Sequence, residues 1–352
     1  MSLLPQALTF SDVLLKPLAS DIKSRSEISL KTRITPKVEI DFPLISINMD
    51  CVTGVDMAIA MAKYGGVSFY PRFAPIDVQA KEIKKILNQG FLVIPAVGIK
   101  AQELDRVDAL VKVGVKIITI DVAHGHLQSC LDFVKNVKSK YPDLEVIAGV
   151  VGTYEGARDL FLAGADSVRV GVGPGSICTT RIMTGCGAPQ ITALFDAYQA
   201  AKEFNRPIIS DGGTKTPGDI VKALAAGANA VVLGYQLAGS TEAPGKLFNK
   251  DGKQYKTYNA STSKTEKLKQ FLLNSSDKKA DFVDYVEGME ACVPFAGPVD
   301  KVLSRLEKGI RSGMSYCGSH NISQLHQKAT FMQVTPALIS ENTNRGVIPL
   351  ID

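Results

Sequence analysis

The chain has 352 residues, of which 45% are hydrophobic, and it carries a net charge of +5 from 40 basic and 35 acidic residues. This length can bury a large core and is typical of an α/β barrel. Charges are spread along the chain and aromatic residues make up only 7%, so no basic stripe with interleaved aromatics suggests nucleic-acid binding. No run approaches the roughly 18 apolar residues of a membrane span, and the start lacks a secretion-type pattern, so we expect a cytoplasmic protein that binds no membrane.

The six cysteines are widely spaced and form no Cys-x-x-Cys pair. Such spacing does not favour a disulfide framework and is typical of reduced thiols inside a cell. We expect Cys51, Cys130 and Cys292 to be buried and inert.

Short apolar runs rich in β-branched residues recur along the chain, and amphipathic stretches lie between them. The runs occupy residues 43–49, 66–70, 91–97, 115–120, 144–150, 166–172, 206–210 and 229–234. Near-continuous apolar runs are typical of parallel strands that are covered on both faces. The stretches 101–114, 153–165 and 216–228 carry apolar residues at three- and four-residue spacing and have a glycine at or near the end, as amphipathic helices do.

Eight apolar runs that alternate with helices predict a (β/α)8 barrel, the TIM-barrel fold. A doubly wound sheet is the alternative, because a sequence does not show whether the sheet closes. We expect a single barrel domain over residues 1–352.

A long polar segment interrupts the alternation after the eighth run. It covers about residues 238–294 and includes Asp251-Gly252, a pair typical of hairpin turns. A loop of this length in a compact protein is usually functional or else disordered, so we predict a lid or flap after the eighth strand. A last helix over residues 299–314 is expected to close the chain.

Polar residues and glycines gather where the predicted strands end, which is the face that carries the chemistry of a barrel. They are Arg72, Asp121, the loop 171–187, residues 210–213 and Gly234-Tyr235. The glycines let backbone N–H groups approach an anion, or carbonyls converge on a cation. Because barrels commonly hold a phosphate after the seventh and eighth strands, we expect a phosphorylated small molecule as ligand.

The loop 171–187 reads GVGPGSICTTRIMTGCG. It is a weak dinucleotide fingerprint, because Pro174 interrupts the glycine spacing and Ser176 takes the last glycine position. Cys178 has hydroxyl neighbours and a nearby arginine, a setting that favours the thiolate, so we expect it to be a nucleophile. His124 and His126 have no third partner at zinc-ligand spacing, so no metal site is expected there.

Several longer motifs resemble the IMP dehydrogenase/GMP reductase family. They are LTFSDVLLKP from residue 8, NMD from 48, DVAHGH from 121, GVGPGSICTTRIMTGCGAPQ from 171, SDGGTKTPGDIVKALAAGA from 210 and VVLGYQLAGSTEAPG from 231. The matches run in order from about residue 8 to residue 334, so the resemblance covers nearly the whole chain.

This resemblance implies a (β/α)8 barrel, assembled as a homotetramer, that binds a purine nucleoside monophosphate (GMP or IMP) and NADP or NAD. Cys178 matches the nucleophile that adds to purine C2, and Asp211 matches the residue that binds the ribose hydroxyls. The substrate, chiefly its phosphate, is expected at Ser176, Gly213, Gly234, Tyr235, Tyr258 and Gly288. The nicotinamide cofactor is expected at Arg72, Asp121 and Gly171, and a potassium ion at the carbonyls of Gly173, Gly175 and Cys178.

The family's two reactions share a thioimidate on Cys178, and other residues decide between them. A dehydrogenase hydrolyses this intermediate with an Arg-Tyr pair on its flap, but the chain contains no Arg-Tyr dipeptide, which leaves Lys278 as the candidate base. A reductase instead protonates departing ammonia with a threonine and a glutamate, which match Thr180 and Glu287. Residues 70–91 also leave no room for the paired regulatory CBS domains of most IMP dehydrogenases.

We therefore interpret the chain as a GMP reductase, which converts GMP and NADPH to IMP, ammonia and NADP. An IMP dehydrogenase, which converts IMP, NAD and water to XMP and NADH, is the alternative, since STEAPG and ALISENTNRG resemble dehydrogenases. Because Tyr235, Asn259 and Ala260 depart from the family's usual residues, a nucleotide-binding paralogue with altered activity is a third interpretation.

Overall fold

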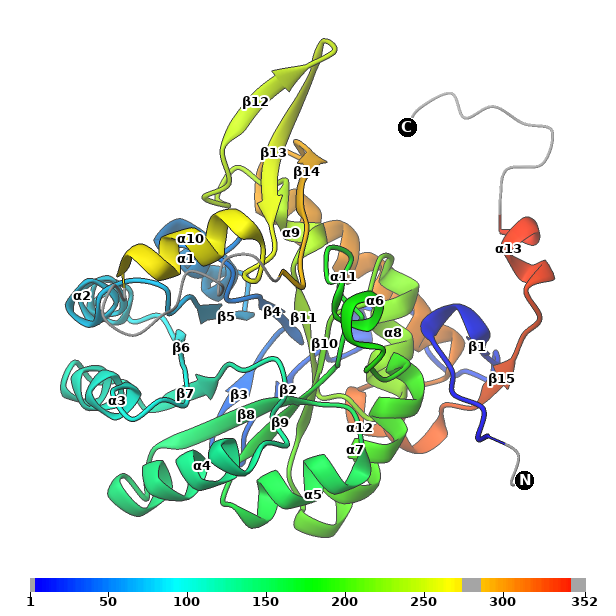
Figure 1. Cartoon of the computed structure of the whole chain (residues 1–352). Coiled ribbons are helices and arrows are strands. Elements are labelled where there is room, and N and C mark those ends of the chain that lie inside the picture. The colour runs from blue at the N-terminus through cyan, green and yellow to red at the C-terminus, as the bar shows by residue number, and fades with distance from the viewer. Residues whose placement is uncertain (1–3, 274–285, 343–352) are drawn as a thin grey trace.

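The computed structural model describes residues 4–273 and 286–342, and its centre is a closed barrel of eight parallel strands (Figure 1). The strands are β4 (Leu44–Ser46), β5 (Val67–Tyr70), β6 (Ile94–Val97), β7 (Ile117–Ile120), β8 (Glu145–Val151), β9 (Ser167–Val170), β10 (Ile208–Asp211) and β11 (Ala230–Leu233). Each pairs with its neighbours in chain order, and β11 returns to pair with β4. The predicted (β/α)8 barrel is therefore confirmed, and the doubly wound alternative is wrong.

Helices cover the outside of the barrel between successive strands. They are α1 (Val55–Lys63), α2 (Ile76–Leu87), α3 (Glu103–Lys112), α4 (Gln128–Lys140), α5 (Tyr154–Leu162), α7 (Gln190–Phe204) and α8 (Pro217–Ala225). At the N-termini of α5 and α8, the side chains of Thr153 and Thr216 accept backbone N–H groups. Gly114, Gly164 and Gly227 follow α3, α5 and α8 with positive φ, which is the expected role of glycine after a helix.

The inside of the barrel is filled by apolar side chains. Ile45, Phe69 and Ile117 are fully buried there, together with aliphatic residues from the other strands. The hairpin of β2 (Thr32–Arg33) and β3 (Glu39–Ile40) contributes Ile34 and Ile40 to the same cluster. The cluster leaves the carboxyl ends of the strands as the place for a ligand, as in other barrels.

The segment after β11 forms an arm that projects from the barrel (Figure 1). It consists of an antiparallel sheet of β12 (Leu247–Lys250), β13 (Lys253–Asn259) and β14 (Glu290–Pro294), with α10 (Lys264–Leu273) between β13 and β14. Asp251 and Gly252 both have positive φ in the β12–β13 turn, which confirms the predicted hairpin.

The end of the chain is more elaborate than the sequence suggested. The predicted last helix is α11 (Val299–Tyr316), but it does not close the chain: α12 (Ile322–Lys328), β15 (Phe331–Gln333) and α13 (Ala337–Glu341) follow it. β15 pairs with β1 (Val13–Leu15). These elements are too short to show a period in sequence, and β15 exists because it finds a partner at the other end of the chain. The remaining short elements are η1 (Phe10–Asp12), η2 (Arg25–Glu27), α6 (Thr180–Thr184) and α9 (Tyr235–Ala238).

Within residues 4–273 and 286–342, no helix has the length and apolar character needed to cross a bilayer. We propose that residues 1–352 form one barrel domain, with residues 238–294 as an excursion within it and no regulatory CBS domain. The strand and helix order along the described chain supports this division, because every barrel strand is used once and in order.

Truncation of Ile117 to alanine is expected to lower the free energy of unfolding by about 2–5 kcal/mol, because it opens a cavity in the closely packed barrel interior. Denaturant unfolding measures the loss. Leu162→Ala is the matched control, since Leu162 is 59% exposed and its truncation leaves the core intact. An equal effect of the two substitutions would contradict the packed interior.

Candidate active site

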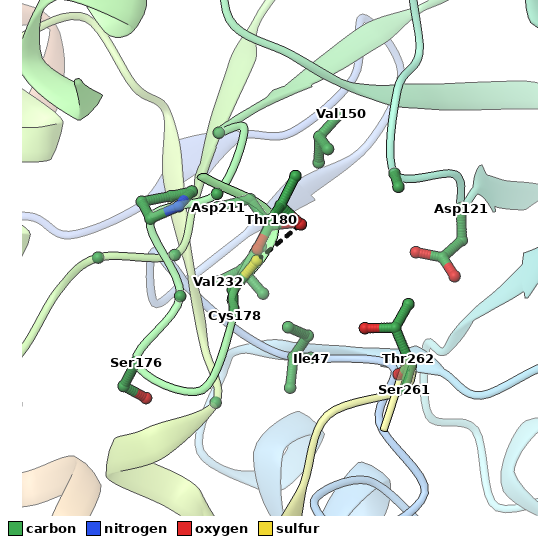
Figure 2. Close-up of a pocket in the computed structure, with 18 of the residues that line it drawn as sticks. Ile47, Asp121, Val150, Ser176, Cys178, Thr180, Asp211, Val232, Ser261 and Thr262 are labelled. Carbon is green, nitrogen blue, oxygen red and sulfur yellow. Dashed lines mark hydrogen bonds between the residues drawn. The ribbon is translucent and has the colours of Figure 1, made fainter. Parts of the chain in front are cut away.

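A pocket of about 500 Å³ opens at the carboxyl ends of the barrel strands. Among the residues that line it are most of those predicted from the sequence: Arg72, Asp121, Gly171, Gly173, Gly175, Ser176, Cys178, Thr180, Asp211, Gly213, Gly234, Tyr235 and Tyr258. Glu287 and Gly288 are predicted site residues that do not line it, and both contact the loop that does. Figure 2 shows Cys178 near the middle of this pocket, with Ser176 toward one side and Asp121 across from it.

Cys178 begins a short chain of hydrogen bonds that runs through Thr180 to Glu287. Its Sγ donates to Thr180 Oγ1 at 3.2 Å, and Thr180 Oγ1 donates to Glu287 Oε2 at 2.9 Å. The three side chains can therefore move a proton from the thiol through the hydroxyl to the carboxylate, and back again. This is the geometry that a nucleophile with an associated acid–base group requires.

Backbone pairing brings Glu287 to the loop. Cys178 and Gly288 form an antiparallel bridge, the Thr179 amide donates to the Glu287 carbonyl at 3.0 Å, and the Met289 amide donates to Ile177 at 2.9 Å. A Cβ at Gly288 would overlap Ala260 Cβ and lie 2.8 Å from Thr262 Oγ1, so glycine here lets two segments of the arm pack against each other. The arm and the loop thus meet at Cys178.

One end of the pocket presents neutral hydrogen-bonding groups. Tyr258 is buried, which raises its pKa to about 12, and its hydroxyl shares a hydrogen bond with Ser176. A Cβ at Gly234 would lie 2.8 Å from that hydroxyl oxygen, so Tyr258 lies directly against the backbone after β11. Gly213, after β10, has a φ of +86° that favours glycine. Hydroxyls beside glycine backbone suit a phosphate group.

Arg169, which the sequence reasoning missed, forms the floor of the pocket. It lies on β9 and is almost fully buried, and it donates to Asp211 Oδ2 from Nε at 2.8 Å and from Nη2 at 2.5 Å. It also donates to Asn48 Oδ1 at 3.2 Å and to Asp121 Oδ1 at 3.4 Å. Burial opposes its charge, but Asp211 and Asp121 outweigh burial and raise its pKa. An arginine inside the apolar run DSVRVGV is the signal that could have revealed it.

The side of the pocket across from Ser176 carries charge of both signs. Asp121 Oδ2 accepts from Arg72 Nε at 3.4 Å, and the Arg72 guanidinium stacks over Phe73 at 4.4 Å. Ser261 and Thr262, which precede α10, place hydroxyls near Asp121 (Figure 2). Phe73, Ser261 and Thr262 also line the pocket, although no motif in the sequence marked them. A flat ring with an amide substituent fits such a mixture of apolar and polar groups.

Helix α10 covers a carboxyl group beside this pocket. Asp50 follows β4, and burial raises its pKa to about 6, with a further contribution from the nearby charge of Glu266 on α10. Glu266 is itself buried and pairs with Lys269 at 2.7 Å, and Lys269 partly offsets the effect on Asp50. The packing of α10 therefore depends on the ionisation of a carboxyl below it.

The remaining thiols differ in their exposure. All six cysteines are free, and each lies within the described residues. Cys130 is buried and Cys51 half-buried, and burial raises both pKa values to about 11, which makes these thiols poor nucleophiles. The expectation for Cys292 is wrong: it is exposed, because β14 belongs to the projecting arm and not to the barrel wall.

The profile of the IMP dehydrogenase / GMP reductase domain matches residues 7–344. The chain belongs to this family. Its members are NAD(P)-dependent oxidoreductases that act on purine nucleotides. The resemblance noted in the sequence is thereby confirmed, and it extends over nearly the whole chain.

Relatives carry the names of both activities. The chain is 36% identical to the inosine-5'-monophosphate dehydrogenase of Borreliella burgdorferi over 400 residues, covering 98% of each chain. It is 30% identical to the GMP reductase of Leishmania donovani, covering 99% of this chain and 98% of the relative. Among solved structures, a variant of the Trypanosoma brucei GMP reductase in complex with guanosine 5'-monophosphate superposes with a TM-score of 0.93 at 26% identity, covering 98% of this chain and 99% of that one.

The buried carboxyl below α10 predicts a pH-dependent stability. A folded-state pKa raised to about 6 means that Asp50 stabilises the fold while protonated, and this contribution is lost as the pH rises through about 6. Asp50→Asn should therefore gain roughly 3 kcal/mol over the natural chain above that pH and little below about pH 4. Urea unfolding across this range measures the difference. Asp143→Asn, at an exposed position, is the control, and a gain for Asp50→Asn that is independent of pH would rule out the explanation.

Proposed function

We propose that the protein is a GMP reductase, which converts GMP and NADPH to IMP, ammonia and NADP. The observation that carries this proposal is the hydrogen-bonded chain from Cys178 through Thr180 to Glu287. It provides a nucleophile for C2 of the purine together with a group that can protonate the departing nitrogen. The likeness to a reductase structure that holds GMP supports the same substrate.

The pocket suggests how GMP is oriented. Ser176, Tyr258, Gly213 and Gly234 bind the phosphate, with Tyr235 at the rim, where it is 45% exposed. Asp211 binds the ribose hydroxyls with the carboxylate that Arg169 fixes. The guanine then lies over Ile47 and Val232, with C2 at Cys178 (Figure 2). Gly288 acts on the substrate only through its pairing with Cys178.

The side chains then divide the reaction between them. The Cys178 thiol gives its proton through Thr180 to Glu287, and the thiolate forms a bond to C2 of GMP. Glu287 returns a proton through Thr180 to the exocyclic nitrogen, the C2–N bond breaks and ammonia leaves a thioimidate. Reduction at C2 and breakage of the S–C2 bond release IMP and restore the Cys178 thiolate.

The cofactor site is the charged side of the pocket. Arg72, Asp121 and Gly171 would hold the nicotinamide, and Phe73 and Thr262 complete its surroundings. NADPH would supply the hydride for C2 when bound; in the alternative reaction NAD would bind here and accept the hydride from C2 of IMP. Val122, Ala123 and Val150 line this side with apolar surface. Exclusion of water by the bound cofactor matters there, because water at the thioimidate yields XMP.

IMP dehydrogenase is the second candidate, because the 36%-identical relative carries that name. This reaction needs a base that activates water at the thioimidate. The chain has no Arg-Tyr dipeptide, and the candidate base Lys278 lies outside the described residues. The hydrogen-bonded Thr180–Glu287 pair therefore favours the reductase.

We further propose that the protein is a cytoplasmic homotetramer and that its loop binds potassium through the carbonyls of Gly173, Gly175 and Cys178. Neutral carbonyl oxygens are suitable ligands for a hard cation. The Gly175 carbonyl also accepts the Cys178 amide at 3.1 Å, so an ion there would stabilise the same turn that presents the nucleophile.

The nicotinamide absorbance distinguishes the two reactions. We expect it to fall with GMP and NADPH and to stay constant with IMP, NAD and potassium. A rise in the second mixture alone would identify a dehydrogenase. Tight nucleotide binding without a change in either mixture would instead support the binding paralogue.

Side-chain replacements test the roles of the three catalytic residues. Cys178→Ala should abolish turnover, and Thr180→Ala and Glu287→Gln should each lower kcat by about a hundredfold or more. Both should suppress ammonia release from GMP more than hydride transfer from IMP to NADP, because only the first of these partial reactions needs a proton for a departing nitrogen. Glu290→Gln is the control, because this nearby glutamate caps the Thr265 amide and does not touch the loop. Equal loss of both partial reactions would contradict the proposed acid–base role.

A further inference from the structure

Arg181 spans the neck of the loop that carries the nucleophile. It follows Thr180 directly, and its Nε donates to the carbonyl of Val172 at 3.2 Å, near the start of the loop. Its Nη2 donates to the carbonyl of Ala188, at the end of the loop. The Ala188 amide also donates to the Val172 carbonyl at 3.2 Å, so one side chain and one backbone bond close the loop at the same place.

Two glycines make room for this side chain. A Cβ at Gly173 would lie 2.7 Å from Arg181 Cγ, and a Cβ at Gly187 would lie 2.5 Å from the same atom. Both distances are shorter than real carbon contacts, so any larger residue would displace the arginine. Gly173 and Gly187 therefore form a slot that fits the aliphatic part of the Arg181 side chain. These two positions need glycine because the arginine occupies the space of a Cβ.

The charge of Arg181 is not balanced by a carboxylate. None of the salt bridges among the described residues includes it, and its planar guanidinium instead binds two carbonyl dipoles. Burial lowers its pKa, and the negative charge of the Cys178 thiolate acts in the opposite direction.

We propose that Arg181 is the positioning residue of this loop: it ties Val172 to Ala188 and so holds Cys178 and Thr180 in line with Glu287. This inference rests on the proposed function only in so far as Cys178 is the nucleophile. A lysine in its place reaches one carbonyl and not two, because an ammonium lacks the planar fork of arginine.

The test compares Arg181→Met and Arg181→Lys with Ile182→Ala, the neighbouring residue of α6, which is 82% exposed. Misplacement of reacting groups by about 1 Å costs around a hundredfold, so we expect kcat of Arg181→Met to fall by about that factor, with a far smaller change in KM for GMP. The kcat of Arg181→Lys should lie between that of Arg181→Met and that of the natural chain. Ile182→Ala should keep the kcat of the natural chain.

A second readout needs no turnover. Alkylation of Cys178 by iodoacetamide at one fixed pH, followed by mass spectrometry, reports how the loop presents this thiol. Arg181→Met should change the rate of Cys178 alkylation several-fold, with a smaller change for Arg181→Lys. Alkylation of Cys186, an exposed cysteine on the same loop, is the internal reference, because its thiol is accessible whatever the position of Cys178.

Gly187→Ala tests the slot while keeping the charge, which covers the case in which Arg181→Met does not fold. It should lower kcat as Arg181→Met does, whereas Gly218→Ala should not, since a Cβ there meets only Thr216 Oγ1 at 3.6 Å. Unchanged kcat and an unchanged ratio of Cys178 to Cys186 alkylation in folded Arg181 variants would overturn the inference. Turnover by Cys178→Ala would instead overturn the proposed function, and the alkylation ratio would still decide whether Arg181 positions the loop.

Discussion

The buried guanidinium of Arg169 is the interaction on which the site depends. A charge at the end of an apolar barrel interior is tolerated only where acceptors surround it, and here two carboxylates and an amide oxygen do so. Asp211 and Asp121 thereby lose their freedom to rotate. In the binding mode we propose, Asp211 faces the nucleotide half of the pocket and Asp121 the cofactor half, so a single buried cation would fix the relation between the two ligands.

The reacting groups are arranged differently, because they lie on loops above this floor. Cys178 and Thr180 belong to the loop after β9, and Glu287 arrives from the arm through backbone pairing at Gly288. Loops can take a shape that a barrel strand cannot, but they need their own supports. The pairing with the arm and the bonds of Arg181 across the loop neck are two such supports.

The barrel was predictable because its strands are near-continuous apolar runs, and because glycines marked the ends of several helices. Elements whose stability comes from distant partners left no trace, as the pairing of β15 with β1 and the exposed position of Cys292 show. Most site residues came from the family resemblance. Arg169 was missed because a buried charge becomes meaningful only when its partners, far apart in sequence, are seen together. The pairing of Glu287 with Thr180 likewise depends on the fold of the arm.

The separation of nucleophile and acid between two segments also bears on how such enzymes diversify. In the mechanism we propose, the barrel loop brings the nucleophilic cysteine, whereas the arm brings the carboxylate that exchanges protons with it through Thr180. Replacement or drift of one inserted segment can then redirect the product while the scaffold, the nucleotide pocket and the nucleophile stay as they are. A change in the arm alone can therefore change which product is formed.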